Sequence, residues 1–246
     1  EEGCRRVAID DEPVHHNYIK RFVADFEMSL PERELPSTLP DTGKKEAIVG
    51  GGPSGLSAAF YLRRLGHAVT VYDSKPAFGG MLRYGIPEYR LPKKILDFEI
   101  QEILDLGVEA RYKHKMGTDI TIESLEKDFD VIYLAMGAWD NASLRAEGED
   151  LNGVWKGTEF LQKRELGIKI DLTGKRVIVV GGGNTAMDAC RSSLRMGAEE
   201  VTLLYRRTRA EMPANQVEIV AAEEEGVHYH FLAAPTRVIG EKGQVT

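Results

Sequence analysis

Two glycine-rich turns, each placed between an apolar run and a helical pattern, constrain this chain most strongly. They are Gly50-Gly51-Gly52-Pro53-Ser54-Gly55 and Gly181-Gly182-Gly183-Asn184-Thr185-Ala186. An apolar run precedes each turn, and another follows each helix, at 68–72 and 201–205. Strand, glycine turn, helix and strand in this order form a βαβ unit. Its repetition predicts an α/β protein with two Rossmann-like dinucleotide-binding units.

The first turn fits the pattern G-x-G-x-x-G, in which each glycine has a mechanical task. Gly50 allows the tight turn, Gly52 lets backbone approach a pyrophosphate, and Gly55 permits close packing of helix on strand. The helix start, with Pro53 and Ser54, then offers unpaired N–H groups to the phosphates. These five residues are therefore candidate contacts of a dinucleotide.

The residues that follow the first unit's second strand indicate which dinucleotide it binds. Asp73 ends that strand, where an acidic side chain holds ribose hydroxyls and would repel a 2′-phosphate. This favours FAD or NAD over NADP. Gly79 and Gly80 follow, ahead of Met81 and Leu82, and their bare backbone would leave room for an isoalloxazine ring. These glycines therefore favour FAD over NAD. The alternative interpretation is that they only make the loop flexible.

The second turn fits G-x-G-x-x-A, and the strand that follows its helix ends in basic residues instead of an acidic one. Arg206 and Arg207 follow Tyr205 where the first unit has an acid. Guanidinium groups make bidentate contacts to a phosphate and can stack on adenine. The second unit is therefore predicted to bind NADP(H) rather than NAD(H), through the turn residues and these two arginines. A solvated basic strand end is the alternative.

Prolines and apolar spacing indicate how the chain is divided. Residues 1–42 hold an amphipathic helix from about 14 to 26, which needs a partner surface, and then a proline-rich linker. Residues 43–160 are predicted to form the FAD-binding domain and 161–246 an incomplete NAD(P)H-binding domain, joined by a segment near 139–172. The tail is predicted to add strands at 227–231 and 237–239, and the acidic run 223–225 to end a helix in solvent.

Charge and cysteine content exclude several classes of protein. The formal net charge is −7, so no global positive field favours nucleic acid or anionic lipid. No run approaches the roughly 18 apolar residues that span a membrane, and a cytoplasmic location is predicted. Cys4 and Cys190 are the only cysteines, and Met81, Leu82 and Arg83 follow Gly80. A disulfide reductase, which needs a cysteine pair near its flavin, is therefore disfavoured.

Several further motifs resemble the glutamate synthase small-subunit family of flavin-dependent NAD(P)H oxidoreductases. They are Cys4-Arg5-Arg6, Glu12-Pro13-Val14, Lys20-Arg21-Phe22, the stretch from Gly79 to Lys93, Ala135-Met136-Gly137-Ala138-Trp139, and the run from Tyr205 to Ala214. The resemblance implies FAD contacts at Gly50, Gly52, Gly55, Asp73, Gly80, Met81, Arg90 and Gly137, with the backbone around Met116 near the adenine. It implies NADP(H) contacts at Gly181, Gly183, Asn184, Thr185, Arg206 and Arg207.

The same resemblance bears on metal and on completeness. A cysteine just ahead of this Arg-Arg pair is commonly the last ligand of a 4Fe-4S cluster in the family, so Cys4 is the one candidate metal ligand, with a free thiol as the alternative. A cluster takes about four thiolates, which residues outside this chain would have to complete. The family's closing Gly-x-Phe-x-x-Gly-Asp segment is also absent. The chain is therefore expected to be a fragment.

Together these features predict an electron-transfer flavoprotein subunit. NADPH in the second unit would pass hydride to FAD in the first, and the electrons would continue to iron-sulfur clusters of the protein or of a partner subunit in a hetero-oligomer. The electrons could also flow in the reverse direction, which would make NADPH from a low-potential donor. Cofactors carry this chemistry, so no catalytic side chain is predicted. A flavin monooxygenase and a nucleotide-binding scaffold subunit of a larger redox complex are the alternatives.

Overall fold

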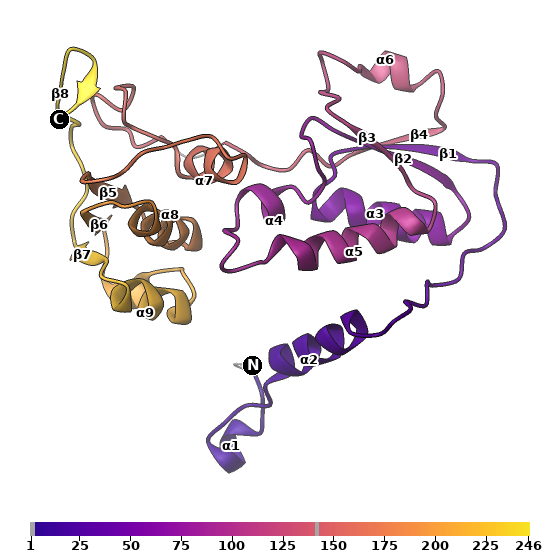
Figure 1. Cartoon of the computed structure of the whole chain (residues 1–246), viewed down its shortest axis with the longest axis horizontal. Helices are drawn as coiled ribbons and strands as arrows, with labels where there is room; N and C mark the ends of the chain where they lie inside the picture. Colours follow the sequence, from indigo (N-terminus) through magenta and orange to yellow (C-terminus); the bar gives the residue numbers. More distant parts are fainter. Residues whose placement is uncertain (1–2, 141–142) are drawn as a thin grey trace.

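The computed structural model describes residues 3–140 and 143–246, which form two α/β units in succession along the chain (Figure 1). A short helical segment precedes them. The predicted fold class, with a repeated βαβ unit, is confirmed.

The first unit is built on a four-stranded parallel sheet of order β3-β2-β1-β4. Its strands are β1 (Lys45–Val49), β2 (Ala68–Asp73), β3 (Glu109–Tyr112) and β4 (Val131–Leu134). Its helices are α3 (Pro53–Arg64), α4 (Met81–Tyr84), α5 (Lys93–Asp105) and α6 (Ile122–Leu125). Ile48 and Val71 of the sheet are buried with Leu56 of α3 and Ile100 of α5. Burial of this face holds the helices against the strands and fixes the turn between β1 and α3.

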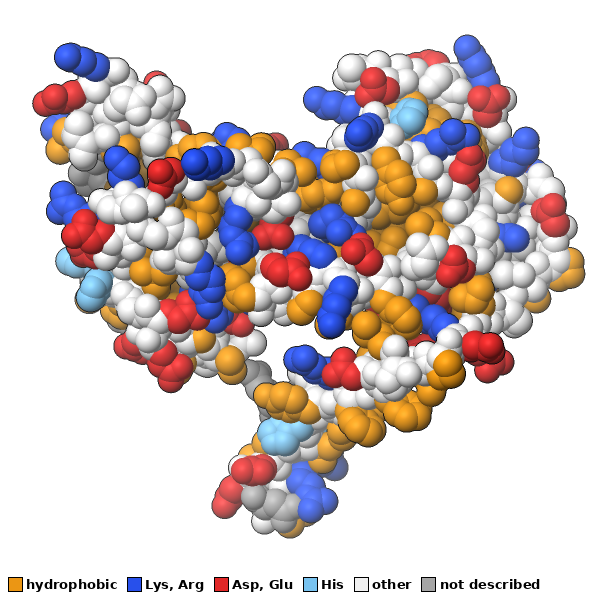
Figure 2. Space-filling view, viewed as in Figure 1, with side chains coloured by type: hydrophobic (Ala, Val, Ile, Leu, Met, Phe, Trp, Pro, Cys, Tyr) orange, Lys and Arg blue, Asp and Glu red, His pale blue; other side chains and the backbone are white. Residues whose placement is uncertain are grey.

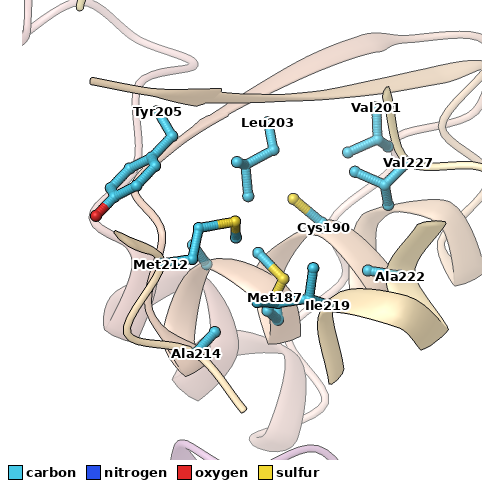
Figure 3. Close-up of a cluster of buried hydrophobic side chains, with 11 residues drawn as sticks. Met187, Cys190, Val201, Leu203, Tyr205, Met212, Ala214, Ile219, Ala222 and Val227 are labelled. Carbon is cyan, nitrogen blue, oxygen red and sulfur yellow. The ribbon is translucent and has the colours of Figure 1, made fainter. Parts of the chain in front are cut away.

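The second unit repeats the plan with a three-stranded parallel sheet of order β5-β6-β7. Its elements are α7 (Gly157–Glu165), β5 (Arg176–Val180), α8 (Asn184–Arg195), β6 (Glu200–Tyr205), the 3-10 helix η1 (Arg209–Glu211), α9 (Gln216–Glu224) and β7 (His228–Phe231). Figure 3 shows Met187 and Cys190 of α8 facing Val201 and Leu203 of β6, with Ile219 of α9 beside them. Burial raises the pKa of the Cys190 thiol to about 12, so this cysteine acts as a packing residue.

The segment that joins the two units contains a helix that the sequence pattern did not show. The predicted boundary after residue 160 falls inside α7, where Phe160 and Leu161 pack on Ala189 of α8. We therefore propose that the second unit begins before Gly157.

The tail also differs from its prediction. The expected strand at 237–239 is replaced by a hairpin of β8 (Gly240–Glu241) and β9 (Gln244–Val245). This hairpin pairs with the joining segment, because the Val245 N–H donates to the Asn152 carbonyl at 2.9 Å. It adds no strand to the β5-β6-β7 sheet.

The amino-terminal segment holds α1 (Val7–Asp10) and α2 (His16–Met28). The predicted amphipathic helix is thus present, and its apolar side chains Tyr18, Phe22 and Phe26 are each more than half exposed. Figure 2 shows apolar side chains gathered along α2. Among the residues described, no helix is long and apolar enough to cross a membrane.

Candidate nucleotide-binding sites

The first glycine turn connects β1 to α3, and two of its glycines are required by packing. A side chain at Gly50, whose φ is +116°, would place its Cβ 2.2 Å from the Ala135 carbonyl oxygen. At Gly55 it would lie 1.8 Å from the Gly50 carbonyl oxygen. Both positions therefore exclude any larger residue.

Gly52 differs, because packing leaves its side-chain position open. A Cβ there would meet only the Gly80 Cα, at an ordinary 3.6 Å. Gly52 is the N-cap of α3, and no side chain of the described residues caps that helix. Pro53 has no N–H group, so the first N–H groups of α3 that remain available to an anion begin at Ser54, as a pyrophosphate requires.

Asp73 accepts two backbone hydrogen bonds, and one of them comes from this turn. Its Oδ2 accepts the Gly51 N–H and its Oδ1 accepts the Lys75 N–H, each at 2.8 Å. Each carboxylate oxygen has a further lone pair, so the group can still accept hydrogen bonds from ribose hydroxyls.

The Gly79–Leu82 segment closes over the same turn. The Gly79 N–H donates to the Gly51 carbonyl at 2.7 Å, and a Cβ at Gly80 would lie 2.7 Å from the Gly52 Cα. Met81 and Leu82 begin α4 directly after it. The structure therefore brings the two glycine clusters of the first unit together, as a flavin site would need.

The second glycine turn has the same construction. Gly181 has a φ of +140°, and a Cβ at Gly182 would collide with the Tyr205 ring at 2.6 Å. Gly183 is the N-cap of α8, and a Cβ there would meet nothing within 4 Å. Ala186 lies close to Gly181, in the place that Gly55 takes in the first turn.

Asn184 and Thr185 form the start of α8. The Asn184 Oδ1 accepts the Asn215 N–H at 3.0 Å, which joins the helix start to the loop before α9. The Thr185 methyl group lies near Gly157 of α7. Among the described residues no side chain caps α8, so its amino end is open like that of α3.

Strand register makes the two units directly comparable. The Gly50 N–H donates to the Tyr72 carbonyl, and the Gly181 N–H donates to the Leu204 carbonyl. The next residue on each neighbouring strand is Asp73 in the first unit and Tyr205 in the second. The carboxylate of the first turn is therefore replaced by an aromatic ring, whose hydroxyl donates to the Glu211 carbonyl at 2.9 Å.

Arg206 and Arg207 come directly after Tyr205, and both are exposed. Within the described ranges no carboxylate pairs with either side chain, whereas the nearby Arg209 is bound to Glu223 at 2.8 Å. Two exposed guanidinium groups therefore follow directly after the position that corresponds to Asp73 of the first unit, and the charge of Arg207 also helps to lower the pKa of Glu211.

Three residues implied by the resemblance lie outside the turns. Met116 bridges to Ile120 and packs on the far face of the first sheet, and Gly137 has a φ of +73° beside the Trp139 ring. Arg90 has other partners, because its guanidinium binds Asp188 and Glu218 of the second unit. No cofactor contact of these three residues is tested, and each stays a prediction.

Cys4 does not form a cluster site with the residues described. Its Sγ accepts the Val14 N–H at 3.4 Å, and this hydrogen bond lowers the pKa of the thiol. No group of three or more His, Cys, Asp or Glu side chains in the described part of the chain could hold a metal ion. The residues present therefore do not fit a 4Fe-4S cluster.

An ionic cluster between the units was missed at the sequence level. The predicted end of α9 at 223–225 is exposed, but Glu225 there also binds the guanidinium groups of Arg191 and Arg195, which was not predicted. Arginines one turn apart on α8 were the available signal, but their partner lies 30 or more residues away.

Comparison with known proteins agrees with the two-unit plan. The family model described as pyridine nucleotide-disulphide oxidoreductase matches residues 44–246, which contain both glycine turns. This chain belongs to the pyridine nucleotide-disulphide oxidoreductase family. Its two cysteines, Cys4 and Cys190, are both free.

Relatives of this family member include two subunits of redox enzymes. It is 43% identical over 268 residues to the NADP(+)-dependent formate dehydrogenase subunit beta of Moorella thermoacetica, covering 100% of this chain and 38% of the relative. It is 35% identical over 239 residues to the glutamate synthase [NADPH] small chain of Escherichia coli, covering 93% and 51%. The predicted family resemblance is confirmed, and the chain spans about half or less of these relatives.

Solved structures show the same fold. FprA of Mycobacterium tuberculosis in complex with NADPH superposes with a TM-score of 0.69 at 20% identity, covering 83% of this chain and 62% of that one. Thioredoxin reductase of Lactococcus lactis gives 0.58 at 20% identity, covering 82% and 69%.

The Glu225 carboxylate leads to a prediction for acid stability. Burial alone would raise its pKa, but hydrogen bonds from Arg195 and Arg191 lower it to about 2. A carboxylate with a depressed pKa stabilises the fold above its unfolded pKa of about 4.5 and loses that contribution as the pH falls toward 2.

We therefore expect Glu225→Gln to cost about 1–2 kcal/mol of unfolding free energy at pH 6, since solvent screens part of the interaction. Urea unfolding followed by circular dichroism should show the difference from wild type shrinking between pH 4.5 and 2. A difference that stays constant over this range would show that the two arginines do not lower the pKa of the Glu225 carboxylate.

Proposed function

We propose that this chain is the nucleotide-binding part of an NADPH-dependent flavoprotein oxidoreductase subunit. FAD would be held at the first glycine turn and NADP(H) at the second. One observation carries this assignment: two turns of matching geometry are followed by opposite charges, a carboxylate at Asp73 and, one and two residues past the corresponding position, the exposed guanidinium groups of Arg206 and Arg207. A carboxylate suits a free ribose diol, and guanidinium groups suit a 2′-phosphate.

The described residues fit these groups. Gly52 and Gly183 leave open space in front of two uncapped helices, where a pyrophosphate would meet backbone N–H groups. The Gly79–Leu82 backbone lies against the first turn and would border a flavin. When bound, the nicotinamide and the flavin supply the hydride chemistry, and the protein supplies their orientation.

The relatives support the same proposal. Their names include NADPH or NADP(+), and each is a subunit of a larger enzyme. We therefore infer that this chain works with a partner subunit that donates or accepts electrons, and that any iron-sulfur cluster involves residues beyond those described. The predicted cytoplasmic location stays a prediction.

Anaerobic mixing of the flavin-containing protein with NADPH tests the proposal. We expect the visible flavin absorbance to bleach rapidly with NADPH and more slowly with NADH at the same concentration. A scaffold subunit would bind nucleotide without bleaching, which would contradict the proposal. In a separate aerobic experiment, oxygen consumption in proportion to NADPH, with a hydroxylated organic product, would instead identify a monooxygenase.

A further inference from the structure

The loop between α4 and α5 connects the two units through side chains. In Figure 1 this loop projects from the first unit toward α8 of the second. Pro87 is fully buried at its base, and Tyr89 and Arg90 follow it. Figure 2 shows basic and acidic side chains interleaved in the middle of this face, between the units.

Arg90 is bound by two carboxylates of the second unit. Its Nη1 donates to both oxygens of Asp188, at 3.0 and 2.9 Å, and its Nε lies 3.1 Å from Glu218. Asp188 is only 3% exposed, so its charge is removed from water and depends on Arg90 for compensation. Burial raises the pKa of Asp188, and the Arg90 hydrogen bonds oppose that rise. This pair is therefore unlike the exposed ion pairs elsewhere on the molecule.

Tyr89 adds a second contact between the units, because its ring packs against arginine side chains of α8. The guanidinium of Arg195 lies 4.0 Å from the centre of its ring and that of Arg191 lies 4.8 Å away. Glu225 binds both arginines, and Glu218 binds Arg191 as well as Arg90. Three guanidinium groups thus face three carboxylates, and a fourth guanidinium, that of Arg164 at 6.0 Å from the centre of the Tyr89 ring, is paired with Glu165, so the charges around the ring balance. Such a network has a fixed geometry because every charge has a partner.

The residues of this cluster also lie on elements that begin at the glycine segments of the two units. Asp188 lies on α8, the helix that starts at Gly183. Arg90 follows α4, the helix that starts at Gly80, and Gly80 packs against Gly52. A second tie lies beside it, where Lys93 of α5 is 3.5 Å from Glu165 of α7.

We propose that Tyr89, Arg90 and Asp188 form a clamp that fixes the orientation of the second glycine turn relative to the first. Units joined by a peptide segment alone are expected to move relative to each other. Hydride transfer needs reacting atoms about 3–3.5 Å apart, so a fixed orientation would let both rings meet without a separate closing motion. Arg90 and Asp188 are positioning residues in this account. The consequence for hydride transfer rests on the proposed function, but the fixed orientation does not.

Distances between spin labels test the clamp without either nucleotide. Labels would be attached at Lys127→Cys in the first unit and Glu199→Cys in the second, both exposed positions, in a Cys4→Ser background. Buried Cys190 would remain unlabelled. We expect one narrow distance distribution for the parent. Arg90→Met and Tyr89→Leu should each at least double its width.

Two variants separate the clamp from general destabilisation. Lys44→Met removes an ion pair within the first unit, with Asp130 at 3.0 Å, and should leave the width unchanged. Arg90→Lys keeps a charge for Asp188 and should recover most of the narrow distribution. Far-ultraviolet circular dichroism would verify folding of each variant.

A narrow distribution in folded Arg90→Met and Tyr89→Leu would overturn the clamp. If both distributions broaden, NADPH affinity should stay within about twofold of the parent while flavin bleaching slows at least tenfold. Broadening in a protein whose parent is never bleached by NADPH would leave the clamp standing and contradict the proposed function.

Discussion

Replacing both Arg206 and Arg207 with alanine is expected to weaken NADPH binding at least ~100-fold, while NADH binding changes by about twofold or less. Hydrogen bonds to charged groups contribute about 1.5–3 kcal/mol each, and 2.7 kcal/mol corresponds to a factor of ~100. Both side chains are exposed, so their removal should leave the fold intact. Isothermal titration with the two nucleotides measures the difference directly.

Arg209→Ala is the matched control for this experiment. Arg209 lies shortly after Arg207, at the start of η1, but its guanidinium is already bound to Glu223. Its removal should change NADPH affinity by less than about threefold, because its charge is compensated. An equal loss of NADPH and NADH affinity in the double variant would place the 2′-phosphate elsewhere.

Gly183→Val should abolish measurable NADPH binding without destabilising the protein. The φ of −94° and ψ of 176° suit a β-branched residue, and no atom lies within 4 Å of the new Cβ. The side chain would instead fill the space in front of the uncapped amino end of α8. We expect a melting temperature within about 2 °C of wild type and at least ~100-fold weaker binding.

Gly182→Ala provides the opposite control. Its Cβ would lie 2.6 Å from the Tyr205 ring, so the loop has to shift, and we expect the free energy of unfolding to fall by about 1–3 kcal/mol.

Gly52→Ala is the counterpart of Gly183→Val in the first unit and should yield folded protein without flavin. Normal NADPH binding by Gly183→Val would show that no pyrophosphate lies at this turn.

Local pattern was sufficient to predict the two βαβ units. In each unit a glycine turn and a helix separate the two apolar strands, β1 from β2 and β5 from β6, and a glycine, Gly66 or Gly197, follows shortly after the helix. The close packing of Gly55 on the Gly50 carbonyl also followed from local geometry, because these residues are close together in the chain. The packing of Gly50 on the Ala135 carbonyl joins distant parts of the chain, and only its role in a tight turn could be predicted.

Features set by distant residues could not be predicted in this way. The predicted role of Arg90 came from a motif, but its partner Asp188 is 98 residues away. The ion pairs of Glu225 at the exposed end of α9 could not be predicted because the two arginines that bind it lie on another helix. The α7 helix was hidden because only Phe160 and Leu161 among its nine residues are buried. The hairpin at β8 and β9 depends on pairing with the joining segment around Asn152.

The crystal structure of the flavin-containing protein soaked with NADP+ tests the central claim most directly. The charges at the two turns predict the FAD pyrophosphate at the amino end of α3 and the NADP+ pyrophosphate at the amino end of α8. The 2′-phosphate should lie within hydrogen-bonding distance of Arg206 or Arg207, and the flavin ribose should contact Asp73. Exchanged positions, or a 2′-phosphate beside Asp73, would contradict the assignment.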